Sequence, residues 1–319
     1  MTRRFAPFLL ASVLLATTAC GGADKPAPTT PGQPDKVITG VIPIVDVAPI
    51  YLGKQQGFFS KRNIDLELKL AQGGAAIVPA VLSGEYQFGF SNVISLLLSQ
   101  ANLGPKLKVV SNGNNSTGDP AKDFGGVVVK ADSPIKTAKD LEGKKVATNT
   151  LKNIVDTSVK SLVRKAQGDP TKVSFVEMPF PNMGAALEQG QVDAIFVVEP
   201  FLSAALAKGW HTLATWADVA PNLCVALYFT STDLVSRNAD LVSRFSAAMQ
   251  ESLAYADANP DAVRQIIGTY TQITEDVRKN MTLPKWPADI NRSSIETMAG
   301  LAVTDGLLKS QPDLGILLP

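Results

Sequence analysis

The sequence of 319 residues has few of the side chains that enzymes use for catalysis or metal binding. It contains one histidine, His211, and two cysteines, Cys20 and Cys224. No Gly-x-Ser-x-Gly motif is present, and no histidines and cysteines stand at metal-ligand spacing. We therefore expect no metal, no cofactor and no catalytic site. If the thiol of Cys20 is acylated after an export signal is cleaved, Cys224 has no cysteine to pair with. No intrachain disulfide can then form, so a hydrophobic core must supply the stability.

The sequence also lacks a large net charge and a membrane-spanning run. Removing Arg3 and Arg4 with the export signal leaves 28 basic and 29 acidic residues, a balance that disfavours nucleic acid as a partner. The apolar run Phe8 to Ala16 is far shorter than the roughly 20 residues that a membrane-spanning helix needs. The composition, 45% hydrophobic, is sufficient for two lobes with separate cores.

Residues 1–19 have the pattern of a lipoprotein signal peptide. Arg3 and Arg4 precede the apolar run, and small residues lead to Cys20. The segment Thr17-Thr18-Ala19-Cys20 resembles a bacterial lipobox, although leucine is usual at the first position; this implies cleavage before Cys20 and acylation of its thiol. An ordinary secretory signal is the alternative. We expect an extracytoplasmic protein that is anchored to the cell membrane by lipid.

The chain after Cys20 divides into a tether and an α/β region. Residues 20–36 are rich in Pro, Ala, Thr and Gly, which predicts a flexible tether. From Val37 onward, short apolar runs alternate with helix-like segments, as in mainly parallel sheets flanked by helices. Expected strands are residues 37–44, 64–68, 88–90, 108–111, 125–130, 145–148, 174–177, 194–197 and 224–230. Expected helices are residues 49–56, 75–82, 93–101, 154–166, 183–188, 201–208 and 238–259.

Two series of strands predict two lobes. The first series ends near Gly118, a polar loop spans residues 112–122, and a second series begins at Phe124. We expect lobe 1 to comprise residues 37–123 plus 231–319, because the helical tail has to pack on a sheet, and lobe 2 to comprise residues 124–230. Two hinge crossings then connect the lobes.

Several segments together resemble the nitrate/sulfonate/taurine and thiamine-precursor family of importer binding proteins. They are residues 49–54, 57–59, 64–67, 73–76, 82–91, 135–146 and 187–201. The resemblance covers nearly the whole chain after the tether. It implies a two-lobed periplasmic-binding-protein fold of type II, a small-molecule ligand, an ABC permease as partner, a monomer and no catalysis.

The candidate binding residues lie in loops beyond the carboxyl ends of the strands, where α/β sheets bind ligands and helix N-termini expose amide groups. Gly73 and Gly74 would let a ligand approach the backbone, and the other candidates supply polar or apolar contacts. The set is Asp46, Ala48, Tyr51, Gly73, Gly74, Ser91, Asn92, Asn149, Thr150, Asn182 and Glu199. Ser91 and Asn92 are also good helix caps. Contacts from Lys152, Phe180 and Phe201 stay open.

The charge of the ligand has two interpretations. Helix N-termini favour a small anion such as a sulfonate, nitrate or carboxylate, which we expect. The absence of arginine from these loops and the presence of Asp46 and Glu199 leave a neutral or amino-bearing heterocycle open. A ligand-sensing subunit of a membrane receptor and a pyrimidine-synthesis-type enzyme are alternative functions on the same fold.

Overall fold

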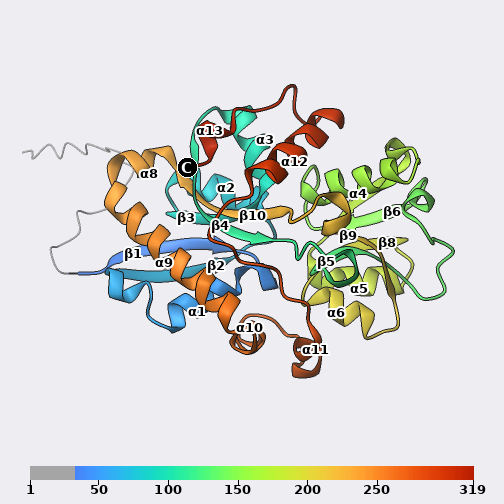
Figure 1. Cartoon of the computed structure of the whole chain (residues 1–319), viewed down its shortest axis with the longest axis horizontal. Helices are drawn as coiled ribbons and strands as arrows, with labels where there is room; N and C mark the ends of the chain where they lie inside the picture. The colour runs from blue at the N-terminus through green and yellow to red at the C-terminus, as the bar shows by residue number, and fades with distance from the viewer. Residues whose placement is uncertain (1–32) are drawn as a thin grey trace, which may run out of the picture. The chain divides into compact units, whose positions relative to one another are not determined.

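The computed structural model describes residues 33–319, so the expected export signal, the acylation of Cys20 and most of the tether lie outside the described residues. The described chain forms two five-stranded sheets, each flanked by helices (Figure 1). Their strand orders are β2-β1-β3-β10-β4 and β7-β6-β8-β5-β9. Within residues 33–319, every helix is too short or too polar to cross a membrane.

The strands of the first sheet are β1 (Asp35–Val41), β2 (Ile64–Leu70), β3 (Phe88–Asn92), β4 (Leu107–Asn115) and β10 (Cys224–Ser231). Those of the second are β5 (Gly125–Val129), β6 (Lys145–Thr148), β7 (Ser174–Glu177), β8 (Ala194–Val198) and β9 (His211–Thr215). The α-helices are α1 (Ala48–Gln55), α2 (Gly74–Ser83), α3 (Val93–Leu103), α4 (Ile154–Lys165), α5 (Phe180–Glu188), α6 (Phe201–Leu206), α7 (Trp216–Val219), α8 (Thr232–Arg237), α9 (Ala239–Ala258), α10 (Pro260–Ile266), α11 (Glu275–Asn280), α12 (Arg292–Thr304) and α13 (Leu314–Leu317). Short 3-10 turns join several of them.

One strand in each sheet runs against its neighbours. β1 pairs in parallel with β2 and β3, whereas β10 is antiparallel to β3 and β4. In the second sheet β6 pairs in parallel with β7 and β8, and β5 is antiparallel to β8 and β9. β5 and β10 are the first strands after the chain passes from one sheet to the other. The chain thus has the predicted fold class: two lobes, each a mainly parallel sheet flanked by helices, joined by two crossings.

Aromatic side chains anchor the core of each lobe. In the first, Phe88 of β3 stacks on Phe245 of α9 with ring centroids 3.7 Å apart, and both rings are fully buried. In the second, Phe196 of β8 packs against Trp216 with centroids 4.3 Å apart. Helix α9 also contacts α1 and β4, so the C-terminal helices pack on the first sheet. Burial of such rings is the main stabilising term of each lobe.

Three details differ from the sequence-based expectations. β4 extends to Asn115, where a polar loop was expected, because Asn112 donates a hydrogen bond to the carbonyl of Pro287 (2.8 Å) and is fully buried. β9 was not predicted. β10 pairs with β3 and β4, although residues 224–230 were assigned to lobe 2. We therefore propose that β10 belongs to lobe 1. The other predicted lobe boundaries stay predictions.

Candidate functional site

The two lobes are in direct contact where the sheets' strands end. The side-chain amide of Gln72, after β2, donates to the carbonyl of Asn149, after β6, at 2.9 Å. Asn149 returns a weaker hydrogen bond from its own amide to the carbonyl of Gln72 at 3.4 Å. The structure therefore has the lobes closed upon each other, and the segments predicted as cleft loops meet at this contact.

Glu199 joins the lobes from the other side of the contact. Its carbonyl accepts from the amide of Val45 at 2.9 Å, and its carboxylate accepts from the amide of Thr282 at 3.1 Å. Ser203 donates to the same carboxylate from its amide and its hydroxyl. Burial raises the pKa of Glu199 to about 7 against the lowering effect of these bonds. With three donors, Glu199 holds the inter-lobe surface and has little capacity left for a ligand.

Gly73 and Gly74 permit close packing at the start of α2. A Cβ atom on Gly73 would lie 2.7 Å from Cγ2 of Thr150 and 3.0 Å from Nδ2 of Asn149, both in the opposite lobe. A Cβ atom on Gly74 would lie 1.8 Å from the hydroxyl of Ser91 in the same lobe. Gly73 has an extended backbone, so it is the lack of a side chain that is needed here. Thr150 and Ser91, both buried, complete this contact.

The asparagines at the cleft cap their helices. Asn92 accepts from the amide of Ser95 at 2.9 Å at the start of α3. Asn153 accepts from the amide of Val155 at 2.8 Å at the start of α4 and donates to Thr150 at 2.6 Å. These caps use amide groups that would otherwise be offered to an anion. Helix α2, whose N-cap Gly73 has no side chain, retains its amide groups.

Asp46 is a buried carboxylate with one unsatisfied oxygen among the described residues, as is Asp156. It is 1% exposed and accepts one side-chain hydrogen bond, from the amide of Asn114 to Oδ2. Within the described residues its Oδ1 has no partner, and neither has Oδ1 of Asn114. Burial raises the pKa of Asp46 to about 7, and the charge of Asp123 adds to this. Each of the two hydrogen-bonded side chains therefore keeps one buried acceptor oxygen without a donor in the described part of the chain.

Three tyrosines surround Asp46. Tyr51 stacks on Tyr270 with ring centroids 4.1 Å apart, and the hydroxyl of Tyr270 donates to the carbonyl of Ile44 at 3.1 Å. Burial raises the pKa of Tyr228 well above its usual value, and the nearby charge of Asp46 raises it further. The hydroxyl of Tyr228 is buried and lacks a hydrogen-bond partner among the described residues. Tyr228 thus adds a third unsatisfied polar group beside Asp46 and Asn114.

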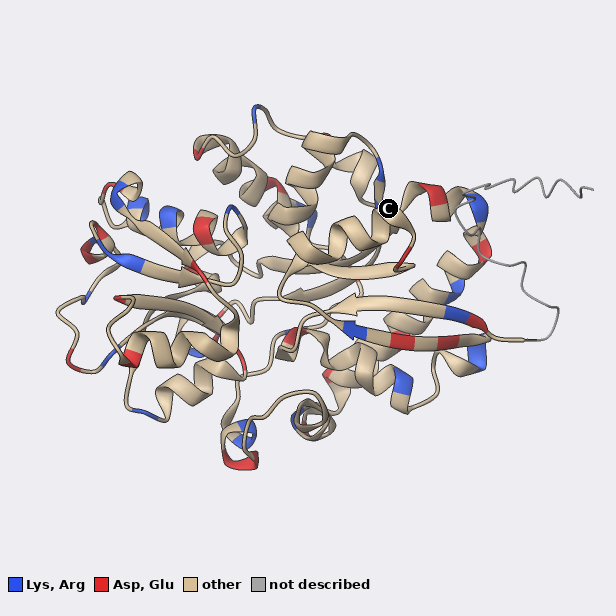
Figure 2. Cartoon of the chain, turned by 180° about the vertical axis from the view of Figure 1, so that it is seen from behind, with Lys and Arg blue, Asp and Glu red and all other residues tan. Residues whose placement is uncertain are grey.

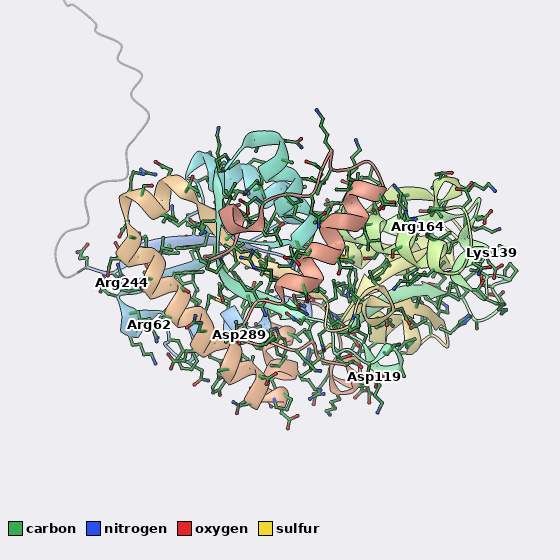
Figure 3. The ribbon with its side chains drawn as sticks, turned by 45° about the horizontal axis from the view of Figure 1, so that its top comes forward. Arg62, Asp119, Lys139, Arg164, Arg244 and Asp289 are labelled. Carbon is green, nitrogen blue, oxygen red and sulfur yellow. The ribbon has the colours of Figure 1, made fainter. Side chains whose placement is uncertain are left out.

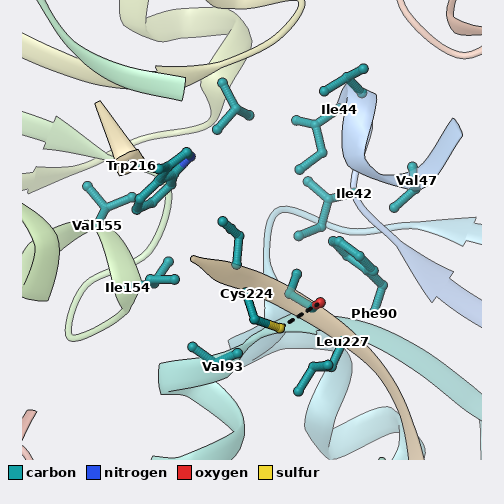
Figure 4. Packing of buried hydrophobic residues seen from close by; sticks show 14 of the residues in the cluster. Ile42, Ile44, Val47, Phe90, Val93, Ile154, Val155, Trp216, Cys224 and Leu227 are labelled. Carbon is teal, nitrogen blue, oxygen red and sulfur yellow. Dashed lines mark hydrogen bonds between the residues drawn. The ribbon is translucent and has the colours of Figure 1, made fainter. Parts of the chain in front are cut away.

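Apolar side chains of both lobes border this polar centre. Figure 4 shows Ile154, Val155 and Trp216 of the second lobe opposite Ile42, Ile44 and Phe90 of the first, with Cys224 of β10 below them. Trp216 is 1% exposed, and its indole Nε1 has no hydrogen-bond partner within the part of the chain that is described. Cys224 is a free, buried thiol whose pKa is raised by burial, so it serves as a small apolar residue.

A second, apolar space lies beside this centre. A cavity of about 480 Å³ is lined by α5 and α6 of the second lobe and by the loop after α10, with Phe180, Phe201 and Tyr270 among its walls. Roughly 300–1,000 Å³ is the usual size of a ligand pocket. Tyr270, one of its walls, reaches the first lobe through the hydrogen bond of its hydroxyl to the carbonyl of Ile44, whereas Asp46, Asn114 and Tyr228 do not line the cavity. Phe180 and Phe201 are therefore placed to contact a ligand that enters from this side.

The predicted residues fall into three groups. Gly73, Asn149, Thr150 and Glu199 lie at the contact between the lobes. Other predicted residues are buried within the first lobe, at strand or helix ends: Asp46, Ala48, Gly74, Ser91 and Asn92. Tyr51, on α1, stacks on Tyr270. Asn182 is exposed on α5, and its backbone amide bonds to the carbonyl of Pro179 at 2.9 Å. Lys152 is exposed as well, with a left-handed backbone (φ 54°). The structure does not bring Asn182 or Lys152 to the polar centre.

Among residues 33–319, the buried acidic residues are Asp35, Asp46, Asp123, Asp156 and Glu199, and no lysine or arginine is buried. They do not form one cluster, since Asp35 lies at the start of β1 and pairs with Arg244. Figure 2 shows the lysines and arginines mostly on outer helices and loops. Figure 3 places Arg62 and Arg244 at the outer part of the first lobe and Arg164 beside α12. Among the described residues, no group of three or more His, Cys, Asp or Glu side chains is placed to hold a metal ion.

Asn114, Tyr228 and Trp216 were missed as site residues. Asn114 stands in a polar stretch that was interpreted as a loop, and Tyr228 stands in a strand of apolar residues. Trp216 follows the unpredicted strand β9. Ligands are expected to bind beyond the carboxyl ends of strands. If the predicted strand had been extended to Asn115, this rule would have included Asn114.

Comparison with known proteins identifies the family. The description "NMT1/THI5 like" matches residues 44–263, more than half of the chain. The chain belongs to the NMT1/THI5-like family. A curated relative, the nitrate import ATP-binding protein NrtC of Synechocystis sp., is 28% identical over 201 residues; the match spans 56% of this chain and 29% of that longer protein.

Solved structures agree with the fold of this NMT1/THI5-like protein. The periplasmic aliphatic sulphonate-binding protein SsuA of Escherichia coli superposes with a TM-score of 0.71 at 19% identity, over 89% of this chain and 92% of that chain. The periplasmic nitrate-binding protein NrtA of Synechocystis PCC 6803 gives 0.76 at 14% identity, over 89% and 86%. The predicted periplasmic-binding-protein fold is thereby confirmed.

Proposed function

We propose that the protein is the extracytoplasmic solute receptor of an ABC importer. It would capture a small molecule between its lobes and deliver it to a permease. The observation that carries this proposal is the closed contact between Gln72 and Asn149 beside buried polar atoms without partners, at Asp46, Asn114 and Tyr228. Buried polar groups are costly unless a hydrogen-bond partner satisfies them, which a bound solute would do.

Closure of the lobes is the signal that such a receptor transmits. A ligand that contacts both lobes favours the closed state by its difference in affinity between the closed and open states. Separation of the lobes would break the inter-lobe bonds of Gln72, Asn149 and Glu199. The family and the structural neighbours are mostly binding proteins of importers, which are not enzymes, and this supports a receptor over the pyrimidine-synthesis alternative.

The partners and location follow from the same proposal. We propose attachment to the outer face of the cell membrane through acylated Cys20, a monomeric receptor and an ABC permease as partner. A sensing subunit of a membrane receptor is the remaining alternative, and stimulation of a reconstituted permease by the loaded protein separates the two. A receptor of an importer raises transport, whereas a sensing subunit leaves transport unchanged.

The binding function is tested with a glycine variant that hinders closure. The full-length chain is screened by thermal shift against the small-molecule pool of yeast extract, because ligand at about 100 times its dissociation constant should add roughly 2.7 kcal/mol. Gly73→Ala places a methyl group 2.7 Å from Thr150 and should weaken binding. Gly300→Ala, whose Cβ would meet nothing nearer than 3.9 Å, is the matched control and should bind normally. If the two variants bind the ligand with equal affinity, binding does not require the lobes to close at Gly73.

A further inference from the structure

The cavity of about 480 Å³ is an elongated slot between α5 and α6, two helices that lie side by side in the second lobe (Figure 1). It is lined on α5 at positions 180, 181, 184, 185 and 188, and on α6 and the residues after it at positions 201, 204, 205 and 208. Each set repeats with the period of a helix, so each forms one row along its helix. Because an α-helix rises about 1.5 Å per residue, the row on α5 is roughly 12 Å long. Ile195 and Val197, which alternate along β8, lie on the same face of the sheet and form the floor.

Segments of the first lobe border the α5–α6 slot as well. Pro43, after β1, and Leu70, at the end of β2, line it together with the loop of residues 270–273 after α10. Leu70 is 55% exposed although it is apolar, so it offers a hydrophobic rim. Helix α11, which follows the loop, contacts α6 (Figure 1). A molecule in the slot would therefore touch both lobes and favour their closed arrangement.

The charges at the α5–α6 slot compensate each other. Within the described residues, the charged side chains among its walls are Glu188 and Lys208, which pair with each other at 2.6 Å from Oε2 to Nζ. The ammonium group of Lys208 also lies 5.1 Å from the centre of the Trp210 ring, another wall of the slot. An ion that entered the slot would lose its hydration without gaining a free counter-charge, which is costly. The slot therefore suits an uncharged molecule.

The middle of the α5–α6 slot is kept open by the absence of a side chain. A Cβ atom on Gly184, in the middle of α5, would have no heavy atom of the described chain within 4 Å. On α6, the slot is bordered at this level by Ala204 and Ala205, whose side chains are one methyl group each. A space with so few polar groups holds water poorly, because a water molecule needs two to four polar partners. An apolar chain can fill it and bury its own surface.

We propose that the α5–α6 slot binds the unbranched alkyl chain of an uncharged amphiphile, such as a long-chain alcohol, whose polar end lies at Glu188 and Lys208. The cavity has about three times the roughly 150 Å³ of an apolar cavity that takes up one benzene molecule, and its length matches an extended chain. Asp46, Asn114 and Tyr228 are not among its walls. This site is thus additional to the proposed solute site and does not depend on it.

The experiment titrates the full-length chain with a series of unbranched alcohols, butanol, hexanol, octanol and decanol, by calorimetry at pH 8. Burial of one methylene contributes about 0.8 kcal/mol, a factor of about four in affinity, so each step of two methylenes should raise the affinity about 15-fold. Decanoate should bind at least tenfold more weakly than decanol, because its charge has no free partner in the slot. An affinity that does not rise with chain length would overturn the proposal, and tighter binding of decanoate would overturn the uncharged class.

Variants on both helices test the location. Gly184→Leu places a side chain in the slot and should lower decanol affinity more than tenfold without lowering the thermal midpoint, because leucine is the better helix former. Ala204→Leu, on the facing helix, should have the same effect on affinity. Gly300→Leu is the matched control: Gly300 is also a helix residue, on α12, and its Cβ would meet nothing nearer than 3.9 Å. Decanol affinity equal to that of the wild type in all three variants would overturn the location.

The remaining outcomes separate this inference from other uses of the slot and from the receptor function. A wild type that sediments as a dimer, together with a monomeric Gly184→Leu variant and no binding of alcohols, would assign the slot to a second copy of the chain and overturn the proposal. Chain-length-dependent binding of alcohols without any thermal shift from the small-molecule pool would support the slot and count against the receptor function. A shift from the pool without binding of alcohols would do the reverse.

Discussion

Replacing Asp46 by asparagine should stabilise the ligand-free protein. Burial raises the pKa of Asp46 from 3.8 to about 7, so the ionised form at pH 8 destabilises the folded state by up to about 4 kcal/mol relative to the protonated form. An asparagine carries no charge, and its amide can donate to Oδ1 of Asn114, which has no partner within the described chain. The variant therefore gains stability while it loses ligand affinity, the trade-off expected at a binding site.

The sign of the pH dependence follows from the raised pKa. The folded state holds the proton of Asp46 more tightly than the unfolded state, so the stability of the wild type is full below about pH 4 and falls as the pH rises to about 7. Urea unfolding at pH 5 and pH 8 measures this. Asp46→Asn should exceed the wild type by about 4 kcal/mol at pH 8 and by only about 1.7 kcal/mol at pH 5.

A surface variant and a second acid complete this test. Asp289→Asn should differ from the wild type by less than about 0.5 kcal/mol at both pH values. Glu199, whose pKa burial also raises to about 7, should leave part of the pH dependence in Asp46→Asn. An Asp46→Asn protein that is no more stable than the wild type at pH 8 would refute the reasoning.

Three further predictions concern closure, capping and pH. Arg164→Met should weaken ligand binding roughly tenfold in calorimetry, because buried Asp305 on the other lobe loses its ion pair; Arg164→Met with Asp305→Leu should restore it. Asn92→Leu should cost about 1 kcal/mol in urea unfolding through loss of the α3 cap, and unchanged stability would contradict that role. Ligand affinity should change between pH 6 and pH 8 as Asp46 ionises, because the tyrosines Tyr51, Tyr228 and Tyr270 stay neutral and Asp123 is fully hydrogen-bonded; an affinity that stays constant over this range would exclude Asp46 from the binding site.

The periodicity of apolar residues in the sequence was sufficient to predict most of the strands and helices. The strands Lys145–Thr148 and Ser174–Glu177 have the predicted bounds, because each is a short run with apolar, mostly β-branched or aromatic residues between predicted helices. β9 was missed because His211–Thr215 is only partly buried at a sheet edge and lacks a strong apolar run. The pairing of β10 with β3 and β4 could not be predicted, because pairing between strands that are distant in sequence is not contained in the local sequence pattern.

The site was predictable where topology determines it. Asp46 and Gly73 follow strand ends, and the rule that ligands bind there places both at the inter-lobe contact. Asn114 was not predictable in this way, because tertiary hydrogen bonds keep a run of asparagines in a strand that local polarity assigned to a loop. Asn182 is exposed on α5 and does not take part in this contact, so its role in ligand binding stays a prediction.

Amide hydrogen exchange of the full-length chain, with and without the small-molecule pool, tests the central claim most directly. The exchange of each segment reports local opening, and closure on a ligand should slow it in both lobes at once. We predict protection at residues 44–48, 72–76 and 91–94 of the first lobe together with residues 149–155 and 198–203 of the second. Protection confined to one lobe, or none at all, would contradict a receptor that closes on its solute.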